Sequence, residues 1–481
     1  MLDGLIEERK RKLSNLRKEG INPYPAEVNM TLSVSEALDK FSTLSGKKKK
    51  VYLVGRVKAF RDQGGVLFFD IDDGTGKIQV VAKKTDLRNF SLIKNNTDIG
   101  DFVEVSGILF KTKRGEKSIE GKTLRIIVKS LRPIPSDFYG LEDTETKLRK
   151  RYLDFVVNSE LREVFVRKAK FWETFRSFLV KEGFLEVETP VLESVPGGAD
   201  AEPFITKHKA LDTDFYLRIS LEIALKKLLV AGLPKVFEIG RIFRNEGISA
   251  EHLQDYTQLE FYWAYSNYEE LMKMIEKMYK SVVKNTRGST TTNWQGKKIN
   301  WGKRWPRVDY YTIFKEKVGM DLKKVSRDEL FARAVKEGLS PEKSAGVGRL
   351  IDLLFKKLVR PSFIDPAFLV NPPASIEPLA KRIPEEPYKV YRFQIMACGT
   401  ELGKGFSEAN DPIDQRERFE EQMKLREKGD KEAQMLDEDF IEALEYGMPP
   451  AAGFGVSERF FAVLMDKPVR ETVFFPLMRR K

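Results

Sequence analysis

Two segments near the middle of the chain alternate apolar and polar side chains with a period of two. They are "VFEIGRIFRNEG" (236–247) and "YTQLEFYWAY" (256–265). This period predicts two strands whose side chains point alternately to opposite faces of a sheet. We expect an antiparallel hairpin that places Arg244 and Glu246 on one polar face with Glu238. The simplest interpretation is that this face is solvated, and the alternative is a binding pocket. The connection, Ile248 to Asp255, is longer than most hairpin loops and carries His252.

The composition is that of a globular protein, and the net charge favours a polyanionic partner. Of 481 residues, 41% are apolar and 11% aromatic, and the net charge is +12. We find no apolar run of membrane-spanning length, and the charged N-terminus lacks the apolar core of a signal peptide. A basic chain favours a nucleic-acid partner. We therefore expect a cytoplasmic location and no membrane partner.

The scarcity of cysteine and histidine limits the metal chemistry. The chain has one cysteine, Cys398, and two histidines. An internal disulfide framework is thereby excluded, and a zinc site built from these residue types is not expected. Carboxylates would have to hold any metal ion, which favours Mg²⁺.

Changes in composition and in the spacing of apolar residues along the chain predict its domains. Residues 1–50 form an N-terminal helical extension, with a helix over about 1–20 that ends at Gly20. Residues 51–135 contain about five short alternating strands, which predict a small β-barrel of the OB-fold type. Residues 136–150 form a proline-bearing linker, and 151–481 form a larger domain. Within it we expect helices at about 160–183, 220–231 and 267–285, more helices over 308–360, and a charged helical stretch over 411–447.

The barrel segment carries residues suited to single-stranded nucleic acid. Phe68 offers an aromatic platform, Arg56 and Arg61 offer positive charge, and Gln79 offers an amide for base edges. The alternative is that Phe68 belongs to the core of the barrel.

Other polar residues cluster at three places in the larger segment. Glu222 follows a strand-like stretch, Glu401 and Glu408 flank Phe406, and glycines precede Arg459 where a helix begins. Glutamates interleaved with glycine, arginine and aromatic residues indicate a pocket for a cationic ligand and a nucleotide.

These motifs together resemble those of the class II lysyl-tRNA synthetases along almost the whole chain. "RYLDFV" with "GFLEVETPVL" resembles motif 1, "GRIFRNEGISAEH" with "YTQLEFYWAY" resembles motif 2, and "GFGVSER" resembles motif 3. "GGADAEPFITKHKALD" and "ELGKGFSEANDPIDQRERFEEQ" are similar to the lysine-type elements of the class. The resemblance implies an α+β fold, in which an N-terminal OB-fold barrel precedes an antiparallel sheet flanked by helices. It also implies a homodimer built on motif 1.

The implied activity is the ATP-dependent attachment of lysine to tRNA(Lys) through a lysyl-adenylate, with release of pyrophosphate and AMP. Arg244 matches the motif 2 arginine that holds the α-phosphate and the lysine carboxylate, for which a forked guanidinium is suited. Arg459 matches the motif 3 arginine on the other side of the nucleotide, and both arginines are expected to be catalytic. The remaining implied ATP contacts are Glu246 at adenine, His252 at the outer phosphates, and Tyr256, where the family has a stacking phenylalanine.

The resemblance also implies a lysine site, a metal site and an anticodon site. Gly198 and Glu222 match positions at the α-amino group, Glu260, Tyr262 and Glu408 match positions around the ε-ammonium, and Phe406 matches a position on the aliphatic stem. Carboxylates in a partly dry pocket favour a cation. Glu401 and Gln394 match the Mg²⁺ positions, and the anticodon-reading residues implied in the barrel are Arg61, Phe68, Gln79 and Glu116.

Four departures from the family pattern stand in or near these motifs. Gln394 replaces a metal-binding glutamate, and an amide is a poorer Mg²⁺ ligand than a carboxylate. Lys404 replaces an asparagine near the lysine site. "HLQDY" replaces "HNPEF", and motif 3 is one residue shorter, with Glu458 in place of an aspartate.

Two other functions stay open at this point. One is an aspartate or asparagine synthetase of the same subclass, against which Glu260 and Glu408 argue, because that pocket would require positive or amide groups. The other is a catalytically weak or silent paralogue that binds tRNA, which the four departures motivate.

Overall fold

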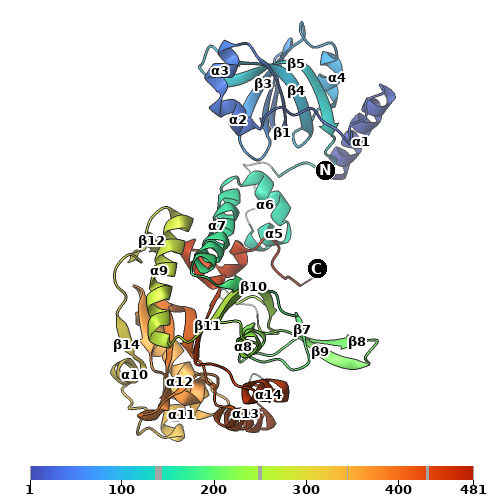
Figure 1. Ribbon diagram of the computed structural model, residues 1–481. Coiled ribbons are helices and arrows are strands. Elements are labelled where there is room, and N and C mark those ends of the chain that lie inside the picture. The colour runs from blue at the N-terminus through green and yellow to red at the C-terminus, as the bar shows by residue number, and fades with distance from the viewer. Residues whose placement is uncertain (1, 136–142, 248–251, 344, 430–432, 480–481) are drawn as a thin grey trace. The chain divides into compact units, whose positions relative to one another are not determined.

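The computed structural model (Figure 1) describes residues 2–135, 143–247, 252–343, 345–429 and 433–479. The chain divides into two compact units, Met1–Asp143 with Tyr152–Val157, and Thr144–Arg151 with Asn158–Lys481. The predicted linker lies partly outside the described residues, at 136–142, as does part of the predicted loop, at 248–251. From Thr144 the chain is helical, with α5 at Thr144–Arg149 and α6 at Arg151–Val157.

The first unit is a closed five-stranded barrel with strand order β1-β2-β3-β5-β4. Its strands are β1 (Lys50–Asp62), β2 (Val66–Asp72), β3 (Lys77–Lys83), β4 (Phe102–Lys111) and β5 (Lys117–Val128). All neighbours pair antiparallel except β3 and β5, which are parallel. The predicted barrel of the OB-fold type is therefore confirmed.

Helices close the barrel and share its core. These are α1 (Leu2–Lys18), α2 (Val34–Asp39), α3 (Phe41–Gly46) and α4 (Phe90–Asn96). Leu16 of α1, Val34 and Ala37 of α2, and Phe41 of α3 are buried in one cluster with the inward side chains of the strands. The N-terminal helices therefore belong to the same hydrophobic core as the barrel.

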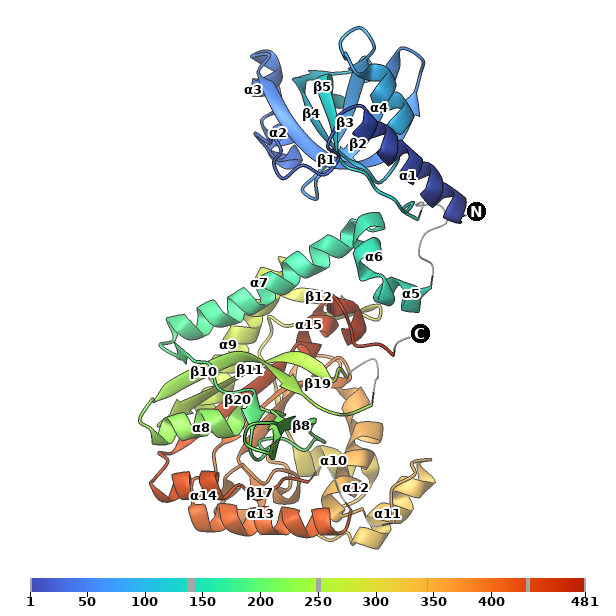
Figure 2. The same cartoon turned by 90° about the vertical axis from the view of Figure 1, so that its right-hand side faces the viewer.

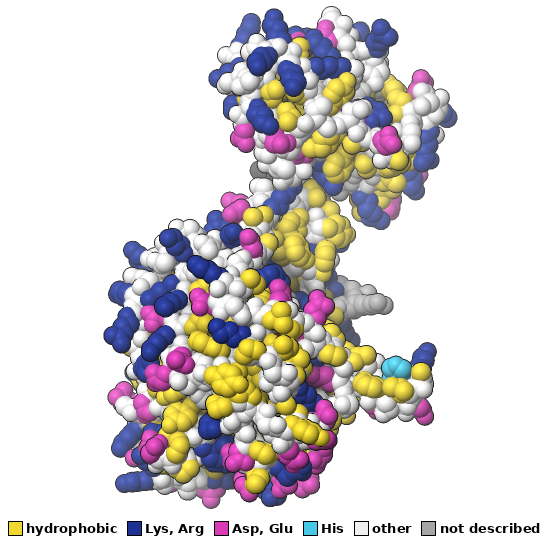
Figure 3. Space-filling view, viewed as in Figure 1, with side chains coloured by type: hydrophobic (Ala, Val, Ile, Leu, Met, Phe, Trp, Pro, Cys, Tyr) yellow, Lys and Arg dark blue, Asp and Glu magenta, His cyan; other side chains and the backbone are white. Residues whose placement is uncertain are grey.

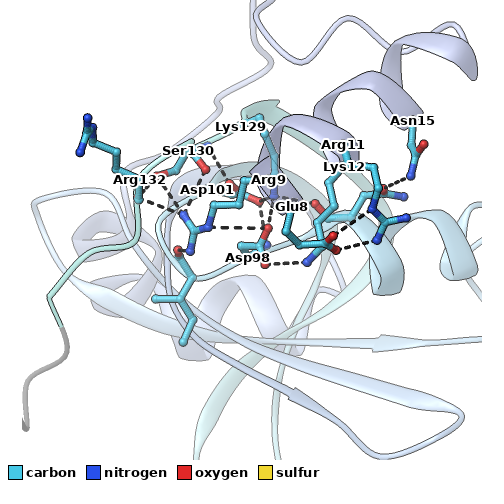
Figure 4. Close-up of polar contacts among 12 residues, drawn as sticks. Glu8, Arg9, Arg11, Lys12, Asn15, Asp98, Asp101, Lys129, Ser130 and Arg132 are labelled. Atoms are coloured by element: carbon cyan, nitrogen blue, oxygen red, sulfur yellow. Dashed lines mark hydrogen bonds and ion pairs between the residues drawn. The ribbon is translucent and has the colours of Figure 1, made fainter. Parts of the chain in front are cut away.

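A polar network fixes α1 to the barrel (Figure 4). The ammonium of Lys129 is fully buried and pairs with Asp101 at 2.8 Å and Asp98 at 2.5 Å. Lys12 of α1 pairs with the same Asp98 at 2.7 Å. Arg9 of α1 donates to the carbonyl oxygen of Ser130 at 3.1 Å. Since buried charges need partners, the paired Asp98 and Lys129 connect α1 to the barrel through Lys12.

The second unit is built on an eight-stranded sheet of order β14-β15-β18-β19-β20-β11-β10-β6. The strands are β14 (Arg307–Asp309), β15 (Ala367–Val370), β18 (Arg392–Ala397), β19 (Thr400–Ser407), β20 (Ala451–Ser457), β11 (Asp255–Ala264), β10 (Lys235–Phe243) and β6 (Leu185–Glu186). The six central strands are antiparallel, and the edge strands β14 and β6 pair parallel with their neighbours. The predicted antiparallel sheet flanked by helices is confirmed.

The remaining elements surround this sheet. The helices are α7 (Glu160–Lys181), α8 (Glu222–Val230), α9 (Tyr268–Arg287), α10 (Tyr310–Val318), α11 (Arg327–Lys336), α12 (Val347–Leu354), α13 (Pro412–Glu427), α14 (Glu438–Glu445) and α15 (Arg459–Leu464), with the helical turns η1 (Phe355–Val359), η2 (Arg360–Ser362), η3 (Ala374–Ile376) and η4 (Val469–Thr472). Short strands form three small sheets: β7 (Leu192–Glu193), β8 (Ile205–His208) and β9 (Thr213–Leu217); β12 (Thr291–Trp294) and β13 (Lys297–Asn300); β16 (Arg382–Ile383) and β17 (Glu386–Val390). Figure 2 shows α13 and α14 side by side, so the charged stretch that we predicted forms two helices.

The two faces of the sheet differ in chemistry. One row across four strands, Phe237–Phe261–Phe454–Gly405, is apolar and packs with α7 and α9. The next row, Glu238–Glu260–Gly455–Lys404–Gln394, points to the opposite face and is polar. Because side chains alternate along each strand, the antiparallel register brings residues distant in sequence into one polar row.

The predicted hairpin exists, but its polar face is not solvated. β10 and β11 pair antiparallel with Glu238 directly opposite Glu260, and both side chains are buried. The strand ends at Phe243, so Arg244 and Glu246 lie beyond it rather than within it. Among the described residues, no helix is long and apolar enough to cross a membrane.

Candidate active site

A cavity of about 1380 Å³ lies over the polar face of the sheet in the second unit. Its wall includes most of the residues that the sequence analysis singled out: Gly198, Glu222, Arg244, Glu246, His252, Tyr256, Glu260, Tyr262, Gln394, Glu401, Phe406 and Arg459. These come from segments more than 200 residues apart, and the sheet register brings them together. Glu408 does not belong to the wall.

Arg244 lies just beyond the end of β10. Its backbone N–H donates to the carbonyl oxygen of Gln254 at 2.8 Å, which extends the pairing of the two segments by one residue. Its Nε donates to the carbonyl oxygen of Ile219 at 3.2 Å, and its guanidinium lies 5.8 Å from the ring centre of Tyr256. The backbone of Arg244 is therefore fixed by Gln254, and its guanidinium is fixed at the wall of the cavity by Ile219.

Both predicted catalytic arginines act on the hydroxyl of Tyr256 through their charge. Burial raises the pKa of its hydroxyl, and the positive charges of Arg244 and Arg459 act against that rise. Arg459 is the first residue of α15, and only Glu458 separates it from the end of β20. Both cations therefore act on one region of the cavity, which is the arrangement that a bound phosphate chain requires.

Glu260 has the most completely defined position among the acids of the cavity. Its Oε1 accepts hydrogen bonds from the hydroxyl of Ser220 at 2.7 Å and the backbone N–H of Leu221 at 3.1 Å. Its Oε2 accepts from the hydroxyl of Tyr262 at 3.0 Å. These donors are neutral, so they orient the carboxylate without pairing it with a cation, and a cationic ligand can take that place.

Lys226 is a functional candidate that the sequence analysis missed. Its ammonium is fully buried between Glu222, at 2.6 Å, and Glu408, at 2.5 Å. It also lies 5.5 Å from the ring centre of Phe406. The four-residue spacing from Glu222 on α8 places the two side chains on one helical face. That spacing could have revealed the pair, but nothing local indicated burial of a lysine.

Burial shifts the protonation of these acids. It raises the pKa of Glu222 to about 7, with Lys226 opposing the rise and Glu260 adding to it. Burial likewise raises the pKa of Glu408 well above its usual value, although Lys226 opposes this. Both acids therefore tend to hold a proton in the free protein, and binding of a further cation would favour their ionised forms.

Two glycines keep this part of the cavity open. A Cβ on Gly453 would lie 2.3 Å from Oε1 of Glu408 and 2.3 Å from Cε1 of Tyr262. Gly198 has a φ of +82°, and a Cβ there would lie 2.8 Å from Cβ of Glu222. A larger residue at either position would displace an acid or an aromatic ring of the site.

The predicted metal position does not offer two carboxylates. The side-chain amide nitrogen of Gln394 donates to Oε2 of Glu401, so that an N–H group rather than an oxygen faces this acid. Within the described parts of the chain, no group of three or more metal-ligating side chains was found. Glu401 alone suits a Mg²⁺ ion whose other ligands are phosphate oxygens and water.

The barrel unit carries a second candidate site, formed by Arg61 and Phe68. Arg61 of β1 stands directly opposite Phe68 of β2, and its guanidinium lies 5.9 Å from the ring centre. Phe68 is half-buried, while its neighbour Phe69 is the fully buried core residue. The alternative that Phe68 belongs to the core is therefore wrong. An outward ring beside a guanidinium is suited to stacking with a base.

The other two predicted barrel residues differ in exposure. Gln79 of β3 is buried, and its Oε1 accepts a hydrogen bond from the hydroxyl of Ser118 at 3.1 Å. Glu116 is exposed in the turn between β4 and β5. Lys and Arg side chains are spread over the visible face of the barrel (Figure 3).

Comparison with known proteins agrees with the fold and the cavity. Residues 143–479 match the family described as tRNA synthetases class II (D, K and N), and residues 51–134 match the OB-fold nucleic acid binding domain. A lysine–tRNA ligase of Moorella thermoacetica is 44% identical over 99% of this chain and 98% of its own length. Lysine–tRNA ligases of Carboxydothermus hydrogenoformans and Fervidobacterium nodosum are 42% and 41% identical, over 99% and 100% of this chain and 98% and 95% of their own lengths. The chain belongs to the class II lysine–tRNA ligase family.

Membership of this family confirms the predicted class, fold and type of enzyme. It also gives ATP as a substrate and tRNA and lysine as partners of the chain. The roles of individual residues remain predictions, and so do the domain boundaries. The structure nevertheless brings every predicted nucleotide and lysine residue except Glu408 to one cavity wall.

Proposed function

We propose that the cavity joins lysine to ATP and that the resulting lysyl-adenylate is transferred to tRNA(Lys). A carboxylate oxygen of lysine attacks the α-phosphorus, the bond from that phosphorus to the bridging oxygen of the β-phosphate breaks, and pyrophosphate leaves. A hydroxyl of the terminal ribose of tRNA then attacks the carbonyl carbon, and AMP leaves. The observation that carries the choice of lysine is the buried, oriented carboxylate of Glu260 beside Tyr262.

Charge balance supports lysine over other amino acids. When ionised, Glu222, Glu408 and Glu260 carry three negative charges, and Lys226 supplies one positive charge. This excess of acids over Lys226 favours an amino acid that brings a second ammonium group, as lysine does. An aspartate or asparagine side chain would bring no second cation and would leave a buried carboxylate unpaired, which is costly.

Arg244 and Arg459 bind the oxygens of the reacting groups. Arg244 holds the lysine carboxylate and the α-phosphate together, and Arg459 holds the other side of the nucleotide. Glu246 reads the adenine, Tyr256 stacks on it, and His252 meets the outer phosphates. A forked, permanently charged donor at each end favours the in-line geometry and stabilises charge that develops on the phosphoryl oxygens.

Within the lysine site, Gly198 and Glu222 bind the α-amino group. Glu260 and Tyr262 bind the ε-ammonium, and Phe406 packs on the aliphatic stem. Glu408 acts on the ε-ammonium from behind the wall, together with Lys226. When it is bound, Mg²⁺ neutralises phosphate charge, and Glu401 would be its ligand from the protein.

We also propose a homodimer and an anticodon-reading barrel. Exposed apolar side chains of α7 and the following strands, Val166, Val180, Leu185 and Leu192, support the dimer. Outward Phe68 and Arg61, with Gln79 and Glu116, would read the anticodon, and the enzyme would act in the cytoplasm.

Charging of tRNA tests this function. The purified chain is incubated with ATP, Mg²⁺, unfractionated tRNA and one labelled amino acid: lysine, aspartate or asparagine. We expect label on tRNA with lysine only. Labelling with aspartate or asparagine would contradict the specificity. Binding of tRNA without labelling by any of the three would instead identify a silent paralogue.

A further inference from the structure

Lys404 occupies a distinctive place on the cavity wall. It lies in β19 directly opposite Gln394 of β18 and directly opposite Gly455 of β20, and all three line the cavity. Gly455 in turn is opposite Glu260 of β11. Lys404 therefore belongs to the same polar row as Glu260, the acid assigned to the amino-acid substrate, and lies two strands away from it.

Lys404 shares its ion-pair partner with a second cation. Its Nζ lies 3.0 Å from Oε2 of Glu377, and Nη1 of Arg392 lies 3.3 Å from the same oxygen. The side chains of Glu377 and Arg392 are almost completely buried, whereas about a third of Lys404 (35%) is exposed. Glu377 is therefore shared between two cations, and Lys404 is the one of the two with the more exposed side chain at the cavity.

Partial burial alone would lower the pKa of Lys404, and Arg392 acts in the same direction. The carboxylates of Glu377, Glu222 and Glu401 nevertheless raise the pKa above its usual value. The side chain is therefore a stable ammonium at neutral pH.

The neighbouring donor set is unsuited to a second divalent ion. Opposite Lys404, Gln394 directs its N–H toward the carboxylate of Glu401. A Mg²⁺ ion requires oxygen ligands in near-octahedral geometry. The ammonium of Lys404 lines the cavity beside this amide, and an ammonium pairs with an anion such as phosphate rather than with a metal ion.

We propose that Lys404 is a substrate-binding residue whose ammonium pairs with the phosphates of the nucleotide, in place of one divalent cation. The chain would then bind ATP with less dependence on Mg²⁺ than a site with a carboxylate at position 394. This inference rests on the proposed function only in taking ATP as the ligand of the cavity.

ATP binding, measured apart from catalysis, tests the proposal. Dissociation constants for ATP are determined by isothermal titration, once with EDTA and once with excess Mg²⁺, for wild type, Lys404→Asn and the double variant Gln394→Glu/Lys404→Asn. We expect Lys404→Asn to weaken binding in EDTA by at least about tenfold, the loss of one charged pair. In excess Mg²⁺ the loss should be smaller. The double variant should regain affinity only when Mg²⁺ is present.

A matched control separates this effect from a general loss of positive charge. Lys298→Asn removes an exposed lysine of β13 that does not line the cavity, and it should bind ATP as wild type does in both conditions. Equal ATP affinity of Lys404→Asn and wild type in EDTA would overturn the proposal. Failure of lysine-dependent activity with the expected ATP-binding pattern intact would count against the proposed function alone.

Discussion

The ammonium of Lys226 and the carboxylate of Glu408 form an ion pair 2.5 Å long, with both side chains completely shielded from solvent. The same ammonium pairs with Glu222 at 2.6 Å. Lys226 therefore links an acid of the cavity wall to one behind it, and it sets how much negative charge the substrate meets.

We predict that Lys226→Met lowers the free energy of unfolding by about 3–5 kcal/mol, because it leaves buried carboxylates without their cation. Lys227→Met is the matched control. Lys227 is partly exposed and pairs with Asp439 at the surface, so its loss should cost about 1 kcal/mol or less. Urea unfolding of both variants measures the difference. Equal losses would contradict the buried ion-pair network.

Lysine binding should depend on pH near neutrality. Burial raises the pKa of Glu222 to about 7, so in the free protein this carboxyl is partly protonated at neutral pH. An ammonium pairs only with the ionised form, so lysine should bind more tightly as the pH rises from about 6 to about 8 and should release protons. Titration calorimetry in two buffers of different ionisation enthalpy measures this release. Glu222→Gln should release fewer protons, and an unchanged release would contradict the assignment.

Two glycines of β20 should respond differently to a methyl group. A Cβ on Gly453 would lie 2.3 Å from Glu408 and Tyr262, whereas the nearest atom to a Cβ on Gly455 is 3.5 Å away. Gly453→Ala should therefore cost about 1–3 kcal/mol of stability through overpacking, and Gly455→Ala less than that. Thermal unfolding compares the two. A larger loss for Gly455→Ala would show that the contacts at Gly453 relax more easily than the structure implies.

Adjacent phenylalanines of β2 should separate nucleic-acid binding from folding. Phe68→Ala removes an outward ring and should weaken tRNA charging by about 1–3 kcal/mol while unfolding stays nearly unchanged. Phe69→Ala empties a core position and should cost about 3–5 kcal/mol of stability. Charging kinetics and unfolding curves of both variants are the readout. If Phe68→Ala lost as much stability as Phe69→Ala, Phe68 would be a packing residue.

The sequence predicted elements well wherever periodicity and turn chemistry were local. The barrel strands, the helix ending before Gly20 (φ +73°), and the hairpin of β10 and β11 all follow from such patterns. Local patterns failed where the environment is set by distant segments. The polar face of that hairpin was assigned to solvent as the simplest interpretation, yet Arg218 and Thr189 bury Glu238 there.

The site was predicted only in part for the same reason. Resemblance gave residue types at motif positions, and the sheet register then placed Lys404 beside Gln394 and opposite Gly455. No sequence pattern could reveal that Glu377 and Arg392 would surround this lysine, because both are fixed by tertiary packing. Lys226 was missed because a lysine is rarely buried unless it is paired. Its second partner, Glu408, is 182 positions away, so the local sequence could not indicate the pair.

The most direct test of the central claim is amino-acid-dependent exchange of labelled pyrophosphate into ATP, which reports adenylate formation without tRNA. Wild type and Arg244→Ala are assayed with lysine, aspartate and asparagine in turn. We predict exchange with lysine only, and a loss in Arg244→Ala of at least a few hundredfold, about 3–4 kcal/mol of transition-state stabilisation. Exchange driven by aspartate or asparagine, or near-normal lysine-dependent exchange by Arg244→Ala, would contradict the account.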